Sequence, residues 1–289
     1  GVGIIHIESG RELFVNGTEP FPMASTFKVP VAVTLFDLVD KGKLRLDSMI
    51  TLKPSDLHPG SGTIWNLLDD PGVVLSLHNL TELMLLISDN SAADLLLKAV
   101  GGAPVVNTQL AALGVQGISV DRQTIQLIAD SMGVKSLPPE SEWSKARFAA
   151  LGLARGLTDA DRAAAKETFY KDPRDTATPT GMARLLAKIW RKEALSPNGS
   201  DQLVDIMFRC ETGLARIKGL LPPGTRVAHK TGTLDIGVTD DVGIIELPNG
   251  AGHVVLTVFV KEAKADLDAQ ERTIAQIGRA VYDYFLFRR

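Results

Sequence analysis

Cysteine is almost absent from this sequence, and its histidines stand far apart. Cys210 is the single cysteine among 289 residues, which excludes an internal disulfide and any metal site built from several cysteines. We interpret Cys210 as a buried, small apolar side chain. None of the five histidines has a second histidine at a spacing that is typical of zinc ligands. The sequence therefore predicts no metal site.

Long apolar runs and runs of one charge are missing as well. No apolar stretch reaches about 18 residues, and no basic and then apolar leader precedes Gly1, so we expect neither a membrane span nor a signal peptide in this chain. The 31 basic and 34 acidic residues are spread along the sequence and give a formal charge of −3. Nucleic acid is therefore not an expected partner.

The apolar residues that are present change their spacing along the chain. Residues 1–16 alternate between apolar and polar around Ser9-Gly10, which is typical of a β-hairpin. Further strands are expected at 226–233, 242–247 and 252–260, with a turn at Pro248-Asn249-Gly250 between the last two. Helical spacing predicts helices at 25–40, 80–87, 92–100, 103–113, 123–132, 178–195 and 266–287.

Strands at both ends of the chain enclose a helical middle, and this order predicts a fold of the α/β (α+β) class. With 45% hydrophobic residues, the chain can bury the core of one large domain or of two closely connected ones. We expect residues 1–24 and 196–289 to build one antiparallel sheet flanked by helices. Residues 25–195 would form a mostly helical subdomain.

The segment S-T-F-K places Ser25 and Lys28 three residues apart at the start of an expected helix. Both side chains would share one face of the first turn, where the lysine amine can reach the hydroxyl. A serine hydroxyl is a weak nucleophile unless a neighbouring base takes its proton, and an amine among apolar groups can act as that base. The alternative is that Ser25 only caps the helix and Lys28 is solvated.

Two further short motifs follow. Ser88-Asp89-Asn90 interrupts a helical pattern, and its structural alternative is a helix break followed by a cap made by Ser91 and Asp94. The motif Lys230-Thr231-Gly232-Thr233 ends an apolar strand, and its alternative is a strand that leads into a turn. In that motif the glycine would allow a ligand to approach the backbone closely.

The three motifs occur once each, in the order S-x-x-K, S-D-N and K-T-G that is typical of class A β-lactamases and penicillin-binding proteins. The segment F-P-M-A-S-T-F-K resembles the family's sequence around the nucleophile, and D-P-R-D-T-A-T-P resembles the end of its omega loop. The resemblance covers nearly the whole chain. The sequence therefore resembles the class A β-lactamases among the penicillin-recognising serine hydrolases, with a β-lactamase/DD-peptidase-like fold.

The resemblance implies a role for each matching catalytic residue. Ser25 would attack the carbonyl carbon, and Lys28 would accept or relay its proton. Ser88 would pass that proton to the leaving nitrogen. Lys230 would hold Ser88 and the substrate carboxylate electrostatically. None of these steps needs a cofactor.

The resemblance also implies the binding residues. Thr231 and Arg216 would contact the substrate carboxylate, and Asn90 would bind the acylamino side chain. The backbone N–H groups of Ser25 and Thr233 would form the oxyanion hole, which stabilises a tetrahedral intermediate by several kcal/mol.

The sequence departs from the family at the omega loop. Class A enzymes carry a glutamate there that activates the deacylating water, and Thr124 occupies its place here. Arg122 and Asp175 resemble the pair that closes the loop, but they are 53 positions apart, which implies an insertion at about 129–171. That insertion could be a lid, contact a partner, or supply a replacement base from Glu167 or Glu140.

A second departure is the acidic sequence after the K-T-G motif. Asp235, Asp240 and Asp241 follow it closely, and their negative charge could alter which substrate side chains are accepted.

Three functions stay open at this point. The first is a β-lactamase with a slowly hydrolysed acyl-enzyme, and the second is a D-alanyl-D-alanine carboxypeptidase. The third is a non-catalytic β-lactam sensor domain, which would normally need a membrane span or a partner domain. The expected ligand is a small-molecule β-lactam or a cell-wall peptide. The resemblance implies a periplasmic or secreted protein, and we expect a monomer.

Overall fold

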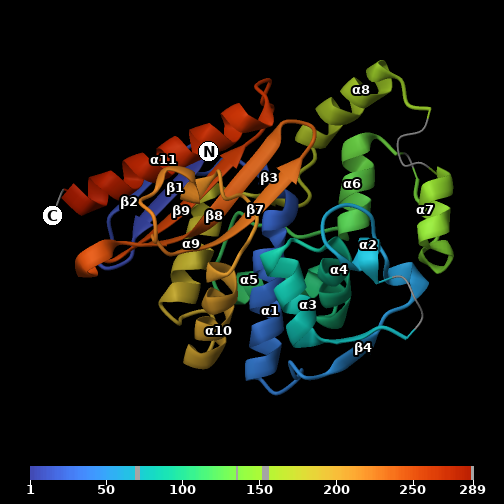
Figure 1. Ribbon diagram of the computed structural model, residues 1–289, viewed down its shortest axis with the longest axis horizontal. Coiled ribbons are helices and arrows are strands. Elements are labelled where there is room, and N and C mark those ends of the chain that lie inside the picture. The colour runs from blue at the N-terminus through green and yellow to red at the C-terminus, as the bar shows by residue number, and fades with distance from the viewer. Residues whose placement is uncertain (69–71, 135, 152–155, 288–289) are drawn as a thin grey trace.

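The computed structural model describes residues 1–68, 72–134, 136–151 and 156–287. A five-stranded antiparallel sheet runs through the molecule in the order β2-β1-β9-β8-β7 (Figure 1). Val2 pairs with Val258, so the beginning of the chain lies beside a segment near its end. This confirms the predicted sheet built from both termini. The strands are β1 (Val2–His6), β2 (Glu12–Val15), β7 (Val227–Leu234), β8 (Val238–Glu246) and β9 (His253–Val260).

Both faces of the sheet are apolar. Side chains along a strand alternate between its two faces, so neighbouring residues of one strand belong to different clusters. Val254 and Leu256 of β9 pack into one cluster with the long terminal helix α11 (Leu267–Phe287). Val255 and Phe259 lie in the other cluster, together with α9 (Pro179–Trp190) and the central helices. Figure 1 shows α11 and α9 on opposite sides of the sheet.

The helical part lies below the sheet in Figure 1, around the buried helix α1. Ser196 caps α10 through an Oγ that accepts the Gly199 N–H at 3.0 Å. The sequence analysis missed this helix because its first residues, P-N-G-S, resemble a loop. The remaining helices here are α1 (Lys28–Asp40), α2 (Ile64–Leu67), α3 (Leu77–Leu86), α4 (Asn90–Ala99), α5 (Ala103–Ala112) and α10 (Pro197–Phe208).

The expected insertion contains the last turn of α6 (Thr124–Met132), together with α7 (Lys145–Leu151) and α8 (Asp159–Tyr170). The prediction of helical structure there is confirmed for the described part, whereas residues 152–155 lie outside the described residues. Two small sheets, of β3 (Phe21–Pro22) with β6 (Thr176–Ala177) and of β4 (Met49–Thr51) with β5 (Val74–Ser76), were not predicted. Their strands are too short to show an alternating pattern.

Gly232 fixes the distance between the sheet and the segment that carries Ser25. A Cβ atom at this position would lie 2.6 Å from the Met23 carbonyl oxygen and 3.1 Å from the Ala24 side chain. A side chain there would therefore push β7 away from the 3-10 helix η1 (Ala24–Phe27). The close approach that this glycine permits is between two parts of the chain itself.

Candidate active site

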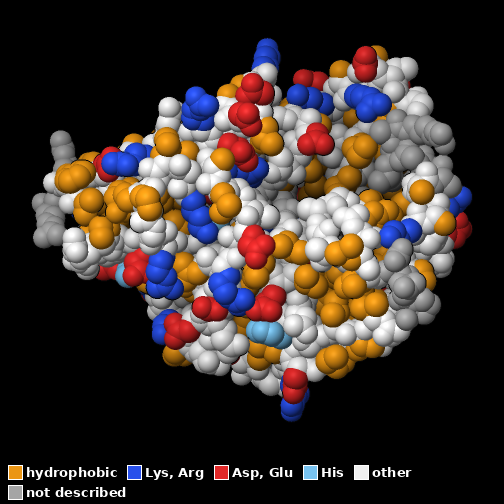
Figure 2. Space-filling view, in the orientation of Figure 1, with side chains coloured by type: hydrophobic (Ala, Val, Ile, Leu, Met, Phe, Trp, Pro, Cys, Tyr) orange, Lys and Arg blue, Asp and Glu red, His pale blue; other side chains and the backbone are white. Residues whose placement is uncertain are grey.

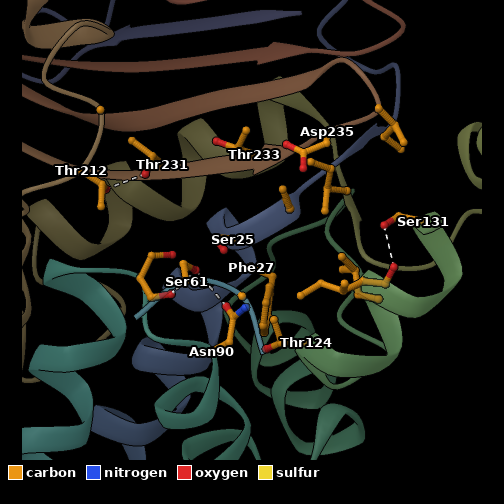
Figure 3. Close-up of a pocket in the computed structure, with 18 of the residues that line it drawn as sticks. Ser25, Phe27, Ser61, Asn90, Thr124, Ser131, Thr212, Thr231, Thr233 and Asp235 are labelled. Carbon is orange, nitrogen blue, oxygen red and sulfur yellow. Dashed lines mark hydrogen bonds between the residues drawn. The ribbon is translucent and has the colours of Figure 1, made fainter. Parts of the chain in front are cut away.

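Ser25 lies in η1, directly before α1, and faces a pocket of about 410 Å³. The residue before it, Ala24, has a φ of +42°, a conformation that non-glycine residues rarely adopt. Figure 3 shows Ser25 between the strand β7 above and the residues Ser61 and Asn90 below. In Figure 2 the molecular surface is hollowed near the end of β7, beside α6.

Lys28 is completely buried beneath this pocket. Its ammonium group donates to the Ser88 carbonyl oxygen at 2.7 Å, to Ser88 Oγ at 3.1 Å and to Asn90 Oδ1 at 2.9 Å. Burial and the nearby charge of Lys230 hold the pKa of Lys28 well below its ordinary value. The lysine of the first motif is thus bound to both polar ends of the second.

Ser88 connects the second motif to the third. Its Oγ also accepts a hydrogen bond from Lys230 Nζ at 3.0 Å, so two buried ammonium groups share one hydroxyl oxygen. Burial lowers the pKa of Lys230 to about 8. Ser88 itself has a φ of +61°, which places it at a sharp turn between α3 and α4. Such backbone conformations cost about 1–3 kcal/mol and concentrate at functional sites.

The predicted binding residues line the same pocket. Asn90 lies on its lower side and donates through Nδ2 to the Pro59 carbonyl oxygen. Thr231 and Thr233 lie along β7 on the upper side (Figure 3). Two further pocket residues were not predicted from the sequence. Ser61 Oγ donates to the Ser88 carbonyl oxygen at 2.8 Å, and Thr212 shares a 2.6 Å hydrogen bond with Thr231.

Arg216 reaches the pocket, but most of its donors are engaged within the protein. The Nε atom pairs with Glu271 at 2.9 Å, and Nη1 donates to two backbone carbonyl oxygens, those of Gly232 and Asp240. One Nη2 proton goes to Thr233 Oγ1 at 2.7 Å. Since a guanidinium has five N–H donors, one remains for a substrate carboxylate. The structure thus makes Arg216 a support for Thr233 as well as a possible ligand.

Thr124, which the sequence predicts to stand at the position of the family's glutamate, lines the pocket at the start of α6. Its hydroxyl donates to Asp94 Oδ1 at 2.7 Å, and its backbone N–H donates to the same oxygen at 2.6 Å. The second oxygen of Asp94 lies 2.6 Å from His58 Nδ1. The predicted cap by Ser91 and Asp94 is therefore wrong. Asp89 caps α4 instead, by accepting the Ala92 N–H.

The two ends of the expected insertion are joined by an ion-pair cluster. Arg122 Nε lies 2.5 Å from Asp175, and Arg122 Nη1 lies 2.6 Å from Asp130 and 3.0 Å from Asp172. Burial opposes the charge, but these carboxylates outweigh it and raise the pKa of Arg122. The guanidinium therefore fixes α6 to the segment in front of β6.

The two glutamates considered as replacement bases lie outside the pocket. Glu140 is at the surface in an ion pair with Lys98 at 2.9 Å. Glu167 lines a separate surface hollow on α8. The side chains of α6 that follow Thr124 and reach the pocket are mainly apolar, namely Leu127, Ile128, Ser131 and Met132. Of these, Ser131 and Met132 belong to the expected insertion.

Of the three aspartates that follow the third motif, Asp235 lines the pocket. Asp240 and Asp241 are fully buried elsewhere. The Asp241 carboxylate pairs with His229 at 2.9 Å, and Asp240 accepts the Val260 N–H. Neither carboxylate lines the pocket, and their expected influence on substrate choice stays a prediction.

Comparison with known proteins agrees with this arrangement. A family model described as the β-lactamase enzyme family matches residues 1–285. The chain is 30% identical to β-lactamase VEB-1 of Pseudomonas aeruginosa over 99% of its own length and 85% of the relative. It is 28% identical to the extended-spectrum β-lactamase PER-1 of the same organism, covering 99% and 82%.

Solved structures give the same result. An ancestral class A β-lactamase is 33% identical, with a TM-score of 0.78 and coverage of 98% of this chain and 93% of that one. A β-lactamase from Chitinophaga pinensis is 30% identical, also with a TM-score of 0.78, and covers 98% and 92%. The chain therefore belongs to the β-lactamase enzyme family, as a serine hydrolase of the class A type.

Proposed function

We propose that the protein opens β-lactam rings by forming an ester on Ser25 and hydrolyses that ester slowly. Lys28 takes the proton of Ser25 as its oxygen attacks the ring carbonyl. Ser88 then delivers a proton to the ring nitrogen as the amide bond breaks. The backbone N–H groups of Ser25 and Thr233 hold the oxyanion.

The observation that carries this proposal is the position of Ser88 Oγ between two ammonium groups. A hydroxyl oxygen has two lone pairs, and here Lys28 and Lys230 occupy both. The hydroxyl proton is then the group that remains for the substrate. The lowered pKa of Lys28 supports its role as the base, because a buried amine loses its proton more readily than an ordinary lysine.

The slow second step follows from the chemistry of the pocket wall. A water molecule attacks an ester at neutral pH only if a group takes its proton. Among the described residues that line the pocket, Arg216 and Asp235 are the ionisable ones. Asp235 is exposed on the β7 side, and Arg216 is permanently charged. Thr124 offers only a hydroxyl at the place of the family's base.

The substrate would be a β-lactam or a cell-wall peptide that carries a carboxylate, held by Lys230, Thr231 and the free donor of Arg216. Asn90 would bind the acylamino group. Among the described helices, none is both long and apolar enough to cross a membrane. Such substrates occur in the periplasm and outside the cell, so we place the protein there, as a monomer.

The alternative is a D-alanyl-D-alanine carboxypeptidase on the same fold. The hydroxyl at Thr124 favours it, because a peptidase forms a long-lived β-lactam ester and lacks the fast second step. The two functions differ in their product. The peptidase releases D-alanine from a peptide, whereas the β-lactamase accumulates the opened β-lactam.

The test is a time course of the adduct formed with a fluorescent penicillin. We expect one adduct per chain in the parent and none in Ser25→Ala, because the other pocket serines lack a lysine three residues on. Ser131→Ala is the matched control and should label like the parent. Labelling that persists in Ser25→Ala would contradict the proposal, and release of D-alanine from a peptide without turnover of penicillin would select the alternative.

A further inference from the structure

Thr124 is not an isolated hydroxyl, because a buried carboxylate lies directly behind it. Its Oγ1 donates to Asp94 Oδ1 at 2.7 Å, and Asp94 on α4 is 4% exposed. Anchoring the start of α6 would need only the backbone N–H groups of Thr124 and Ile125, which reach Asp94 at 2.6 and 3.4 Å. The bond from the hydroxyl is additional. It directs the hydroxyl proton toward the carboxylate, so the oxygen lone pairs stay available.

The other side of Asp94 is held by His58, which is buried beneath α4. His58 Nδ1 lies 2.6 Å from Asp94 Oδ2, and Nε2 lies 3.1 Å from the Ser55 carbonyl oxygen. Both ring nitrogens therefore face acceptors. His58 therefore holds the Asp94 carboxylate in one orientation, with Oδ2 toward the ring and Oδ1 toward Thr124.

The position of Thr124 is suited to a water molecule at the ester. Figure 3 shows Thr124 on the lower wall of the pocket, next to Asn90 and across from the β7 residues, with Ser25 between the two walls. On this wall the described residues of α6 are Thr124 and the apolar or hydroxyl side chains that follow it. A water molecule in the pocket can thus be connected to the Asp94 carboxylate through a single group, the Thr124 hydroxyl.

We infer that Thr124 and Asp94 form a proton relay that activates the water that hydrolyses the Ser25 ester. This inference rests on the proposed function. The water oxygen bonds to the ester carbonyl carbon while its proton moves to Thr124 Oγ1 and the proton of Thr124 moves to Asp94 Oδ1. As the bond between that carbon and Ser25 Oγ breaks, the proton returns through Thr124 and pocket water to Ser25 Oγ. Water and ester thereby give a carboxylic acid and the free serine, and no other reactant is consumed.

The experiment separates formation of the ester from its decay. Stopped-flow mixing with a chromogenic cephalosporin gives the first rate, and mass spectrometry of a penicillin adduct gives the second. Thr124→Val keeps the shape of the side chain but removes the hydroxyl, and Thr124→Ser keeps the hydroxyl. Asp94→Asn keeps the shape of the carboxylate but cannot accept the proton. Thermal unfolding of each variant shows whether it is folded.

We expect ester formation in Thr124→Val within about threefold of the parent and decay slowed by about 10²- to 10⁴-fold, the range of general-base help. Thr124→Ser should decay like the parent, and Asp94→Asn, where it folds, should decay like Thr124→Val. Equal decay in Thr124→Val and the parent would overturn the relay and leave Lys28 as the base of both steps. A parent ester that never decays would overturn it too. A parent that forms no ester would instead contradict the proposed function.

Discussion

At the scale of single residues, Lys230 carries a charge whose loss should be visible in the pH dependence of the reaction. Burial lowers its pKa to about 8, so its ammonium group is charged below that pH and neutral above it. We expect the rate of Ser25 acylation by a carboxylate-bearing β-lactam to fall as the pH rises through about 8. A neutral ester should show a smaller loss, because it has no carboxylate for the charge to bind and loses only the effect of the charge on Ser88. Stopped-flow acylation rates between pH 6 and 10 measure both.

Lys230→Arg is the control for this prediction. A guanidinium keeps its charge above pH 12, so the alkaline loss should disappear even if the absolute rate is lower. An alkaline loss near pH 8 that survives in Lys230→Arg would assign the titration to another group. The acid side of the profile belongs to Lys28, whose lowered pKa lets the free base appear as the pH rises.

The motif residues could be predicted from the sequence because each motif is local. The residues that surround the motifs could not, because they come from distant parts of the chain. Ser25 and Lys28 stand three residues apart, and any helical start brings them together. Asp94 and Thr124 are 30 residues apart, and a local reading gave Asp94 to a helix cap. The same distance problem hid Glu271, which occupies the Nε donor of Arg216 from 55 residues away.

At the scale of elements, α7 is part of the core rather than a loose cover. Phe148 is 3% exposed and packs against His58, Trp65 and Trp143 with ring centroids 6.0–6.4 Å apart. We expect Phe148→Ala to lower the free energy of unfolding by about 3–5 kcal/mol, the usual cost of removing a buried phenylalanine ring. Urea unfolding followed by circular dichroism measures this loss.

A variant on the exposed side of the same helix provides the comparison. Arg147 has 46% of its side chain exposed and pairs with Glu142 at 3.4 Å. Arg147→Ala should change the free energy of unfolding by less than about 1 kcal/mol, as is typical of surface ion pairs. Equal small losses in both variants would show that α7 can detach without cost to the fold.

The order of elements along the chain could be predicted, but several boundaries could not. The helix expected from residue 25 begins at Lys28, after a 3-10 turn that positions Ser25. The strand expected from residue 242 begins at Val238. Its first part was not predicted, because the buried polar residues there interrupt the apolar pattern. Thr239 and Asp241 are bonded to partners on α11, on η4 (Ile217–Leu220) and on β7, which no local pattern contains.

At the scale of the whole molecule, Cys210 reports on global unfolding. It is 3% exposed, follows α10, and its Sγ lies 3.3 Å from Thr212 Oγ1. We expect a thiol reagent to label it only through unfolding of the whole chain, because α10 and β7 must separate to expose it. The labelling rate should then increase with urea with the slope of equilibrium unfolding.

Ser48→Cys supplies the exposed reference for this measurement. Ser48 lies in an exposed turn before β4, and a thiol there should react at once and independently of urea. If Cys210 also reacted without dependence on urea, the region between α10 and β7 would open locally, and the molecule would not unfold as a single unit.

The pairing of β1 with β9 has a consequence for how the chain is made. Val2 is synthesised long before its partner Val258, which is added about 250 residues later, or after roughly 10–50 s at ordinary rates of synthesis. During that time β1 has one edge without a neighbour, and contacts between such distant segments form slowly. Lys230 arrives late as well, long after Ser25 and Lys28. A nascent chain therefore cannot react with a β-lactam until β7 is in place. Until β9 follows, the open edge of β1 must be kept from pairing with other chains.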